Sequence, residues 1–305
     1  MSFIVSAMDI FWEKFVKTSD QKRLAKQTEP ENIERVCDIP YIDDGNRYHQ
    51  FDVYYPQQEG VKFPVIIDVH GGGWMYGDKE LNKMYCLHLA KRGFAVFNIS
   101  YTLHPTATVN DQIKEVMQAL KVISETMEAY PCDTNNIMLT GDSAGGQLAV
   151  YAAALLSSEK LRGIFETVDP EMKLKFLLLT SPVSYMNADG IMGVYTRKMW
   201  GDDYKAKRTY PYMNLDSILP FASFPPTLMV TSSGDFMAHN QTKNAARDFE
   251  SNGFKVELMD FPKFEGKDLP HVFSVCEPES KPGKMVIERA VELFRKGIET
   301  SEKVN

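Results

Sequence analysis

The stretch "NIMLTGDSAGGQLAV", residues 136–150, joins an apolar segment to a second apolar segment through a serine flanked by glycines. The pattern Gly141-x-Ser143-x-Gly145 predicts a tight turn from a buried strand into a helix, with the serine hydroxyl exposed and its backbone strained. Only small residues avoid clashes beside such a turn. Because the helix begins at the serine, its N-terminus directs partial positive charge toward any anion formed there.

Apolar segments of strand length alternate with segments of helical periodicity on both sides of this turn. The segment "KFPVIIDVH", residues 62–70, is a continuous apolar run typical of a strand buried on both faces. We therefore predict an α/β fold in a single domain, residues 1–305, with a mostly parallel twisted sheet flanked by helices. Strands are expected at 35–40, 47–56, 62–70, 94–101, 136–141, 174–182, 227–233 and 255–261, and helices at 81–93, 109–130, 143–158, 240–253 and 284–298.

The composition argues against several classes of function. The 305 residues include 34 basic and 41 acidic side chains, so the net charge of −7 gives no basic field for nucleic acid. The four cysteines show no CxxC spacing, which predicts neither a zinc site nor a disulfide framework. The histidines also lack metal-ligand spacing. We expect no metal and no cofactor.

The N-terminal segment carries apolar residues at helical spacing, namely Ile4, Met8, Phe11 and Phe15. This pattern predicts an amphipathic helix whose apolar face covers another surface. Binding to a membrane surface is the alternative, although the polar face is not especially basic. No basic segment precedes the apolar residues as in an export signal, and no run reaches the roughly 18 apolar residues of a membrane span. A cytoplasmic protein without stable membrane insertion is expected.

Residues 184–222 interrupt the alternation of strands and helices. The segment is too long for an ordinary connection. It places Met192, Tyr195, Met199 and Trp200 at helix-like spacing. We expect a small helical cap made of this segment and approximately residues 1–45. The alternative for residues 184–222 is a packed excursion that does not contact a substrate.

A second glycine-rich stretch, His70-Gly71-Gly72-Gly73, ends the strand expected beside the one that leads to Ser143. Acyl transfer builds a negative oxygen that preorganised backbone N–H groups must receive. A run of glycines exposes such donors. The stretch therefore indicates an oxyanion-binding loop next to a serine nucleophile.

A serine nucleophile needs a base and an orienting carboxylate. Only His239 and His271 follow Ser143 among the six histidines. His271 lies in the loop after the strand expected at 255–261, from where it can reach over the sheet edge. We assign His271 as the base and Asp235 as the orienting group. A turn or helix-capping role is the alternative for Asp235, and His239 is the alternative base.

With these residues the chain resembles the hormone-sensitive-lipase-like branch of the α/β-hydrolase superfamily, the esterases with HGGG and GDSAGG motifs, from about residue 45 onward. Residues 100–105 and 271–273 are also similar to family segments. The resemblance implies the triad Ser143, Asp235 and His271, with oxyanion donors at Gly72, Gly73 and Ala144. Whether Gly71 or Gly73 supplies the second loop donor stays open.

The resemblance implies a serine carboxylic-ester hydrolase acting on short to medium acyl esters. Its expected partner is a small ester, and a homodimer is compatible with the sequence. Trp74 and Phe236 are candidate substrate-binding residues, with simple packing as the alternative for Trp74. The residues after Asp235, "FMAHN", differ from the family pattern, so specificity cannot be carried over. The rival functions are a small-amide hydrolase such as an arylformamidase and a non-catalytic small-ligand receptor.

Overall fold

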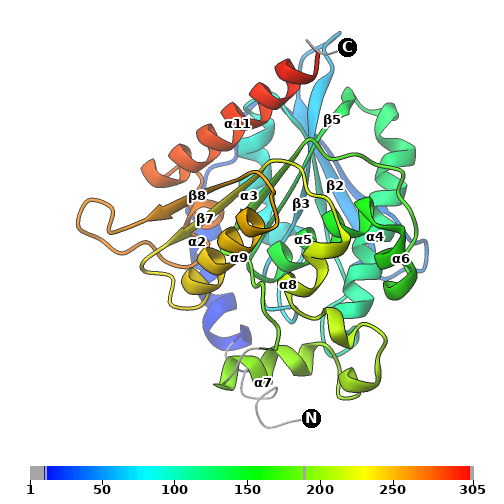
Figure 1. Cartoon of the computed structure of the whole chain (residues 1–305). Helices are drawn as coiled ribbons and strands as arrows, with labels where there is room; N and C mark the ends of the chain where they lie inside the picture. Colours follow the sequence, from blue (N-terminus) through cyan, green and yellow to red (C-terminus); the bar gives the residue numbers. More distant parts are fainter. Residues whose placement is uncertain (1–9, 11, 188–189, 303–305) are drawn as a thin grey trace.

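The computed structural model describes residue 10, residues 12–187 and residues 190–302. Within these residues, eight strands form one sheet in the order β1-β2-β4-β3-β5-β6-β7-β8 (Figure 1). The strands are β1 (Ile33–Pro40), β2 (Gln50–Pro56), β3 (Phe63–Val69), β4 (Ala95–Ile99), β5 (Cys132–Asp142), β6 (Phe176–Thr180), β7 (Thr227–Ser232) and β8 (Val256–Phe261). β2 pairs antiparallel with β1 and β4, and the remaining neighbours pair in parallel. The predicted mostly parallel sheet is confirmed.

Helices cover both faces of the sheet (Figure 1). On β3, Val65 and Ile67 belong to one buried cluster and Ile66 to the other, because successive strand side chains point to opposite faces. The first cluster includes residues of α4 (Val109–Thr126), α5 (Ser143–Ser157), α6 (Glu159–Phe165) and α9 (His239–Ser251). The second includes residues of α3 (Lys79–Ala90), α10 (Phe273–Cys276) and α11 (Lys281–Glu302).

The N-terminal elements are η1 (Trp12–Val16) and α2 (Lys17–Leu24). Of the predicted apolar stripe, Ile4, Met8 and Phe11 lie outside the described residues. The expected cap boundary near residue 45 is wrong, because residues 33–40 pair with β2 as strand β1 of the sheet. Helix α6 was not predicted, since it has only two turns and too few apolar positions to show a period.

The segment expected as part of a cap is helical. Its elements are α7 (Gly190–Met199), η3 (Tyr204–Ala206), η4 (Tyr210–Tyr212), α8 (Leu215–Ile218) and η5 (Leu219–Phe221). Outside this segment, the short helix η2 (Met127–Ala129) extends α4. Tyr195, Met199 and Trp200 are at most 2% exposed, so this segment packs on the body. The side chain of Met192 is not described.

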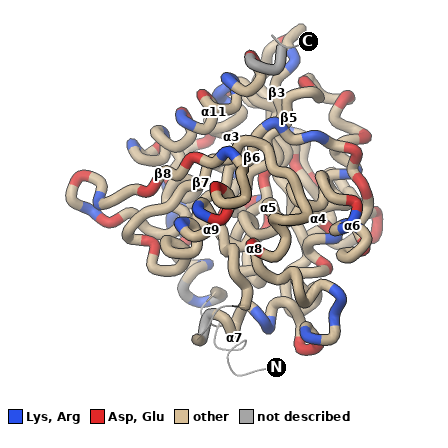
Figure 2. Tube along the Cα trace, viewed as in Figure 1, with Lys and Arg blue, Asp and Glu red and all other residues tan. Residues whose placement is uncertain are grey.

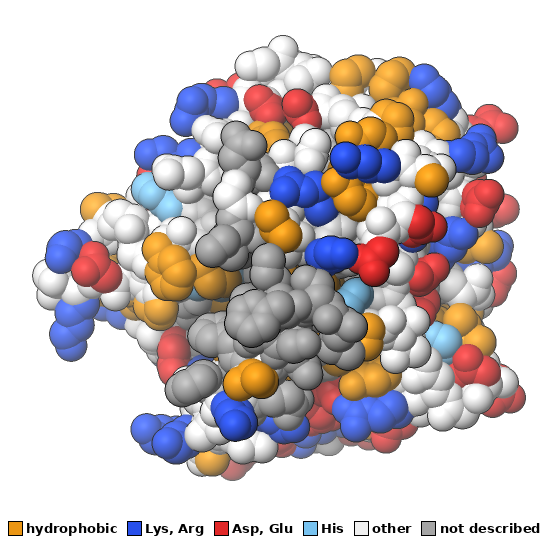
Figure 3. All heavy atoms as spheres, turned by 90° about the horizontal axis from the view of Figure 1, so that it is seen from below, with side chains coloured by type: hydrophobic (Ala, Val, Ile, Leu, Met, Phe, Trp, Pro, Cys, Tyr) orange, Lys and Arg blue, Asp and Glu red, His pale blue; other side chains and the backbone are white. Residues whose placement is uncertain are grey.

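Charged residues of both signs are distributed along the chain (Figure 2). On the described part of the face that carries α7, lysines and arginines alternate with acidic and hydrophobic side chains (Figure 3). A search of the described residues finds no helix that combines the length and the hydropathy needed to cross a membrane.

Candidate active site

The turn between β5 and α5 carries Ser143. Its φ is 53°, in the left-handed region that a residue with a Cβ seldom adopts. A Cβ on Gly141 would lie 2.5 Å from the carbonyl oxygen of Gly145, and a Cβ on Gly145 would lie 2.1 Å from that of Val69. The predicted strained turn and the need for small residues on both sides are therefore confirmed.

His271 lies between Ser143 and Asp235. Its Nε2 is 2.8 Å from Ser143 Oγ, and its Nδ1 is 2.8 Å from Asp235 Oδ2. Because a carboxylate only accepts, Nδ1 carries the hydrogen and Nε2 is free to accept from the serine hydroxyl. The three side chains come from the carboxyl ends of β5 and β7 and from the loop after β8. In such an arrangement an oriented imidazole can activate a serine hydroxyl.

Asp235 is 1% exposed and uses both carboxylate oxygens. Its Oδ1 accepts the N–H groups of Met237 and Ala238 at 3.0 and 2.9 Å, while Oδ2 faces His271. Burial would raise the pKa of Asp235, but the hydrogen bonds to His271, Ser181 and Ala238 hold it below its usual value. One carboxylate oxygen of Asp235 therefore holds the turn, and the other faces His271. The two roles given as alternatives for Asp235 are compatible in this structure.

His239, the alternative base, points elsewhere. Its Nε2 is 2.9 Å from Asp260 Oδ1. Its backbone N–H donates to the carbonyl of Asp235 at the start of α9. The structure therefore brings His271 and not His239 to Ser143.

The glycine loop is held in place through its carbonyl groups. The carbonyl of Gly72 accepts the N–H groups of Met75 and Tyr76 at 3.1 and 3.0 Å. Tyr195 of α7 donates its hydroxyl to the carbonyl of Gly73 at 2.5 Å. Gly72 has a φ of 108°, and a Cβ there would lie 2.0 Å from the carbonyl oxygen of Tyr76. Any other residue at position 72 would therefore displace the loop.

The backbone N–H of Gly71 is already engaged, because it donates to Asp142 Oδ1 at 3.0 Å. Among the described residues, the N–H groups of Gly72, Gly73 and Ala144 have no acceptor. Of the two glycines left open as the second loop donor, Gly71 is thus engaged by a hydrogen bond that the sequence did not indicate, and the assignment of Gly73 stays a prediction. Gly72 also lines the pocket beside Ser143.

Three buried polar side chains are linked by hydrogen bonds to one another and to the glycine loop. Asn82 donates through Nδ2 to Asp68 Oδ2 at 2.9 Å and to Asp142 Oδ1 at 2.7 Å. Burial and then the nearby Asp142 raise the pKa of Asp68 well above its usual value. Burial also raises the pKa of Asp142, against the opposing effect of Asn82, His271 and the Gly71 N–H. The pKa of both carboxyl groups is thus raised, and that of Asp68 the further of the two.

Asp142 thus holds the glycine loop by accepting the N–H of Gly71. Sequence reasoning missed Asp68 and Asn82, because no motif links positions so far apart in the chain. His70 has a structural position: its Nδ1 donates to the carbonyl of Gly71 at 2.7 Å, and its ring stacks on Tyr101 at 4.3 Å. Burial lowers the pKa of His70 to about 4, which keeps it neutral.

Ser143 and His271 open into a pocket of about 200 Å³. Most of its wall is apolar, with one ion pair contributed by α2. Its lining residues are Trp12, Val16, Asp20, Arg23, Gly72, Tyr76, Leu81, Asn82, Asp142, Ser143, Met237, His271, Val272, Val275 and Cys276. The N-terminal elements thus cover the site, whereas no described residue of 184–222 lines the pocket. Tyr195 of that segment contacts the glycine loop through its hydroxyl.

Two predicted substrate contacts need correction. Trp74 is 1% exposed, and its Nε1 donates to Gln147 Oε1 at 3.3 Å, so it packs inside the body and does not line the pocket. Phe236 is 92% exposed and lies outside the pocket wall. Its neighbour Met237 lines the pocket instead.

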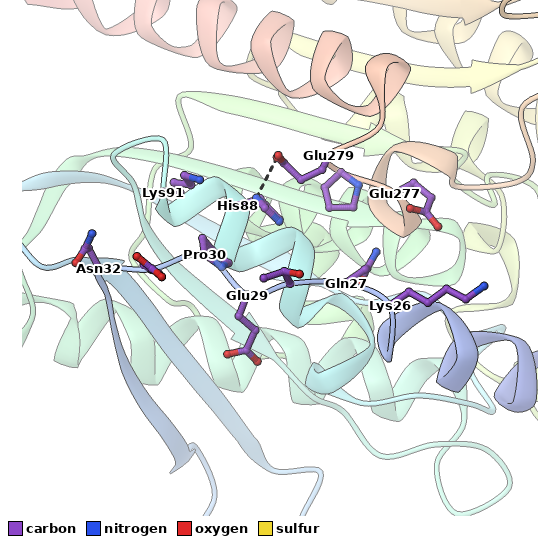
Figure 4. A pocket seen from close by; sticks show the side chains of 12 residues that line it. Lys26, Gln27, Glu29, Pro30, Asn32, His88, Lys91, Glu277 and Glu279 are labelled. Atoms are coloured by element: carbon purple, nitrogen blue, oxygen red, sulfur yellow. Dashed lines mark ion pairs between the residues drawn. The ribbon is translucent and has the colours of Figure 1, made fainter.

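A larger cavity of about 640 Å³ lies at the far end of α2 (Figure 4). It is lined by polar and charged side chains, and His88 Nδ1 lies 3.0 Å from Glu279 Oε1 across it. None of the three residues Ser143, Asp235 and His271 reaches it. Among the described residues, no group of three or more histidine, cysteine, aspartate or glutamate side chains is placed to hold a metal ion.

Comparison with known proteins places this geometry in context. The BD-FAE family matches residues 51–189. Isoprenylcysteine alpha-carbonyl methylesterase ICME of Arabidopsis thaliana is 25% identical over 69% of this chain and 52% of its own. Esterase LipQ of Mycobacterium tuberculosis is 30% identical over 44% of this chain and 32% of its own. The chain therefore spans about half or less of these curated relatives.

The structural likeness covers nearly the whole chain. The crystal structure of esterase B from Lactobacillus rhamnosis superposes with a TM-score of 0.92 at 25% identity, covering 99% of this chain and 97% of that chain. The sheet order, the flanking helices and this superposition confirm the predicted fold class.

Proposed function

We propose that this chain, which has the α/β-hydrolase fold of the matched esterases, hydrolyses carboxylic esters of short to medium acyl chains. The observation that carries the proposal is the continuous hydrogen-bonded line from Ser143 Oγ through His271 to Asp235, with both distances at 2.8 Å. It opens into a pocket that also contains Gly72 of the glycine loop. The esterases among the matched proteins support the same reaction class.

In the proposed first step, Ser143 Oγ attacks the ester carbonyl while Nε2 of His271 takes the serine proton. Asp235 stabilises the imidazolium that forms. The N–H groups of Gly72, Gly73 and Ala144 receive the negative oxygen, aided by the N-terminus of α5. His271 then gives its proton to the departing alcohol, which leaves the acyl group on Ser143.

In the second step, His271 takes a proton from a water molecule, and the resulting nucleophile attacks the acyl carbon. The carboxylic acid departs as the proton returns to Ser143 Oγ. Protonation of His271 would remove the base in both steps, so activity is expected to fall toward acid pH.

The test is hydrolysis of p-nitrophenyl esters from acetate to decanoate by the wild type and by Ser143→Ala. We expect turnover of the shorter esters and a loss of at least about a thousandfold in the variant. If the folded wild type acts on none of them, the ester assignment fails, and small amides come next. Homodimerisation and a cytoplasmic location stay predictions from the sequence.

A further inference from the structure

The pocket beside Ser143 contains an ion pair that the proposed reaction does not use. Arg23 of α2 donates from Nε and Nη2 to Asp20 Oδ1 at 3.2 and 3.0 Å. The side chains are 12% and 15% exposed. Both line the same pocket as Ser143 and His271, among walls that are otherwise mostly apolar.

The guanidinium of Arg23 keeps donors that can serve a ligand. A guanidinium has five N–H groups. Two of those on Arg23 bind Asp20, and a third, on Nη1, donates to the carbonyl of Cys276 at 3.0 Å. Among the described residues no acceptor faces the remaining two. A donor that loses water without gaining an acceptor is costly, so a ligand that displaces water here must supply one.

The charges around Arg23 favour a neutral acceptor on the ligand over a carboxylate. Asp20 already balances the guanidinium, and Asp142 and Glu277 add further carboxylates within electrostatic reach. Burial and the carboxylate of Asp20 also raise the pKa of Tyr76, which keeps that hydroxyl neutral. A ligand carboxylate would thus enter a low-dielectric pocket without a free cation to offset its desolvation. A neutral oxygen avoids this cost.

The hydrogen bond from Arg23 to the carbonyl of Cys276 indicates which part of a bound ester would contact Arg23. Cys276 ends α10, which begins two residues after His271 in the chain, and Val272 and Val275 of this segment line the pocket. The alcohol is the part of an ester that takes its proton from the base. The Arg23 donors therefore lie on the side of the departing alcohol.

We infer that the Asp20–Arg23 pair selects esters whose alcohol carries a neutral oxygen acceptor a few atoms from the ester bond, as in partial esters of polyols or ether alcohols. This inference rests on the proposed ester hydrolysis. It makes Arg23 a specificity-determining residue rather than a catalytic one. It also gives a role to the polar helix α2, which has no buried residue of its own among those of its span.

The test compares three butanoate esters of similar size. In 2-ethoxyethyl butanoate an ether oxygen replaces one CH2 of pentyl butanoate, and 3-carboxypropyl butanoate carries a carboxylate. For the wild type we expect kcat/KM to be at least about tenfold higher with the ether than with the pentyl ester, and lowest with the carboxylate. Equal rates with the first two, or preference for the carboxylate, would overturn the inference.

Two variants and a control locate the effect. Arg23→Met should bring the ratio of ether to pentyl ester close to one, whereas Lys22→Met, on the exposed side of the same helix, should leave the wild-type ratio. Asp20→Asn keeps Arg23 but removes its counter-charge, so the carboxylate ester should gain about tenfold relative to the pentyl ester. An unchanged ratio in folded Arg23→Met contradicts the inference. If that variant does not fold, the Asp20→Asn result decides.

The two proposals fail differently. If no ester of the three is hydrolysed by the folded wild type, the proposed hydrolase is contradicted, and the inference with it. If pentyl and ether esters are both hydrolysed at the same rate, hydrolysis stands and only the inference falls.

Discussion

The two walls of the pocket differ in how they are held. The wall at the sheet edge consists of the Ser143 turn and the glycine loop, and its backbone is fixed by buried contacts such as the hydrogen bond from Gly71 to Asp142. The opposite wall is α2, none of whose residues is buried. Arg23 and Gln27 attach that wall through two side-chain hydrogen bonds to the carbonyl of Cys276.

This difference separates two tasks. Groups that stabilise a transition state must be held before the substrate arrives, because their preorganisation is what lowers the barrier. Groups that recognise the remote part of a substrate tolerate a looser attachment. We therefore expect changes in the sheet-edge wall to lower kcat and changes in α2 to alter KM or substrate preference.

The largest effect is expected from the hydrogen-bonded line itself. Asp235→Asn should lower kcat about 10⁴-fold, because the amide favours the wrong imidazole tautomer and cannot offset the imidazolium charge. KM should change little. Steady-state kinetics with p-nitrophenyl butanoate checks this. His239→Asn is the matched control, since that histidine faces Asp260 and should keep wild-type kcat.

A smaller but still large effect is expected from the glycine loop. Gly72→Ala places a Cβ 2.0 Å from the carbonyl oxygen of Tyr76, so the loop must shift and its N–H donors lose their alignment. We expect kcat to fall by about 100- to 1000-fold. Gly60→Ala, at a glycine of positive φ with open space around it, controls for the backbone cost alone. Similar losses in both variants would refute the steric explanation.

Loosening α2 should act on binding. Gln27→Ala removes the 2.6 Å hydrogen bond to the carbonyl of Cys276. A net loss of about 1 kcal/mol predicts roughly a fivefold rise in KM at unchanged kcat. Hydrogen exchange should become faster in residues 17–24 and stay slow in 136–150. A fall in kcat with unchanged KM would show that α2 belongs to the catalytic wall instead.

The smallest expected effect concerns the contribution of Asp68 to the stability of the folded protein. The raised pKa of Asp68 means that the folded protein binds a proton that the unfolded chain releases. The folded protein therefore becomes less stable as pH rises above the pKa of Asp68 in the unfolded chain, about 3.9. Asp68→Asn carries no proton to lose. Its Tm relative to wild type should therefore increase between pH 5 and pH 8, by a few degrees. A difference in Tm that is constant across this range would contradict a protonated Asp68.

The sequence predicted the parts of the site that depend on local geometry. Ser143 and the glycines around it lie in one contiguous motif, and His271 followed from chain order and the scarcity of histidines. The partners of the loop could not be found this way. The contact of Gly71 with Asp142 joins residues 71 positions apart, and Arg23 reaches a carbonyl 253 positions away. Such pairs leave no periodicity in one sequence.

Trp74 shows a second limit of prediction from the sequence, namely the direction of a side chain near a motif. Its position after three glycines suggested a pocket wall, yet its φ of 63° turns the side chain into the core. There its carbonyl accepts hydrogen bonds from His104 and Gln112 at 2.8 and 3.0 Å. Composition near a motif indicates proximity to the site but not the direction of a side chain.

The central claim is that Ser143 is the nucleophile. A p-nitrophenyl alkylphosphonate tests it directly, because attack by Ser143 Oγ forms a bond to phosphorus and releases one p-nitrophenol. We predict one p-nitrophenol per chain and a single phosphonyl adduct on the peptide that contains Ser143, found by mass spectrometry, with neither in Ser143→Ala. A folded wild type that forms no adduct, or forms it on another residue, would contradict the account.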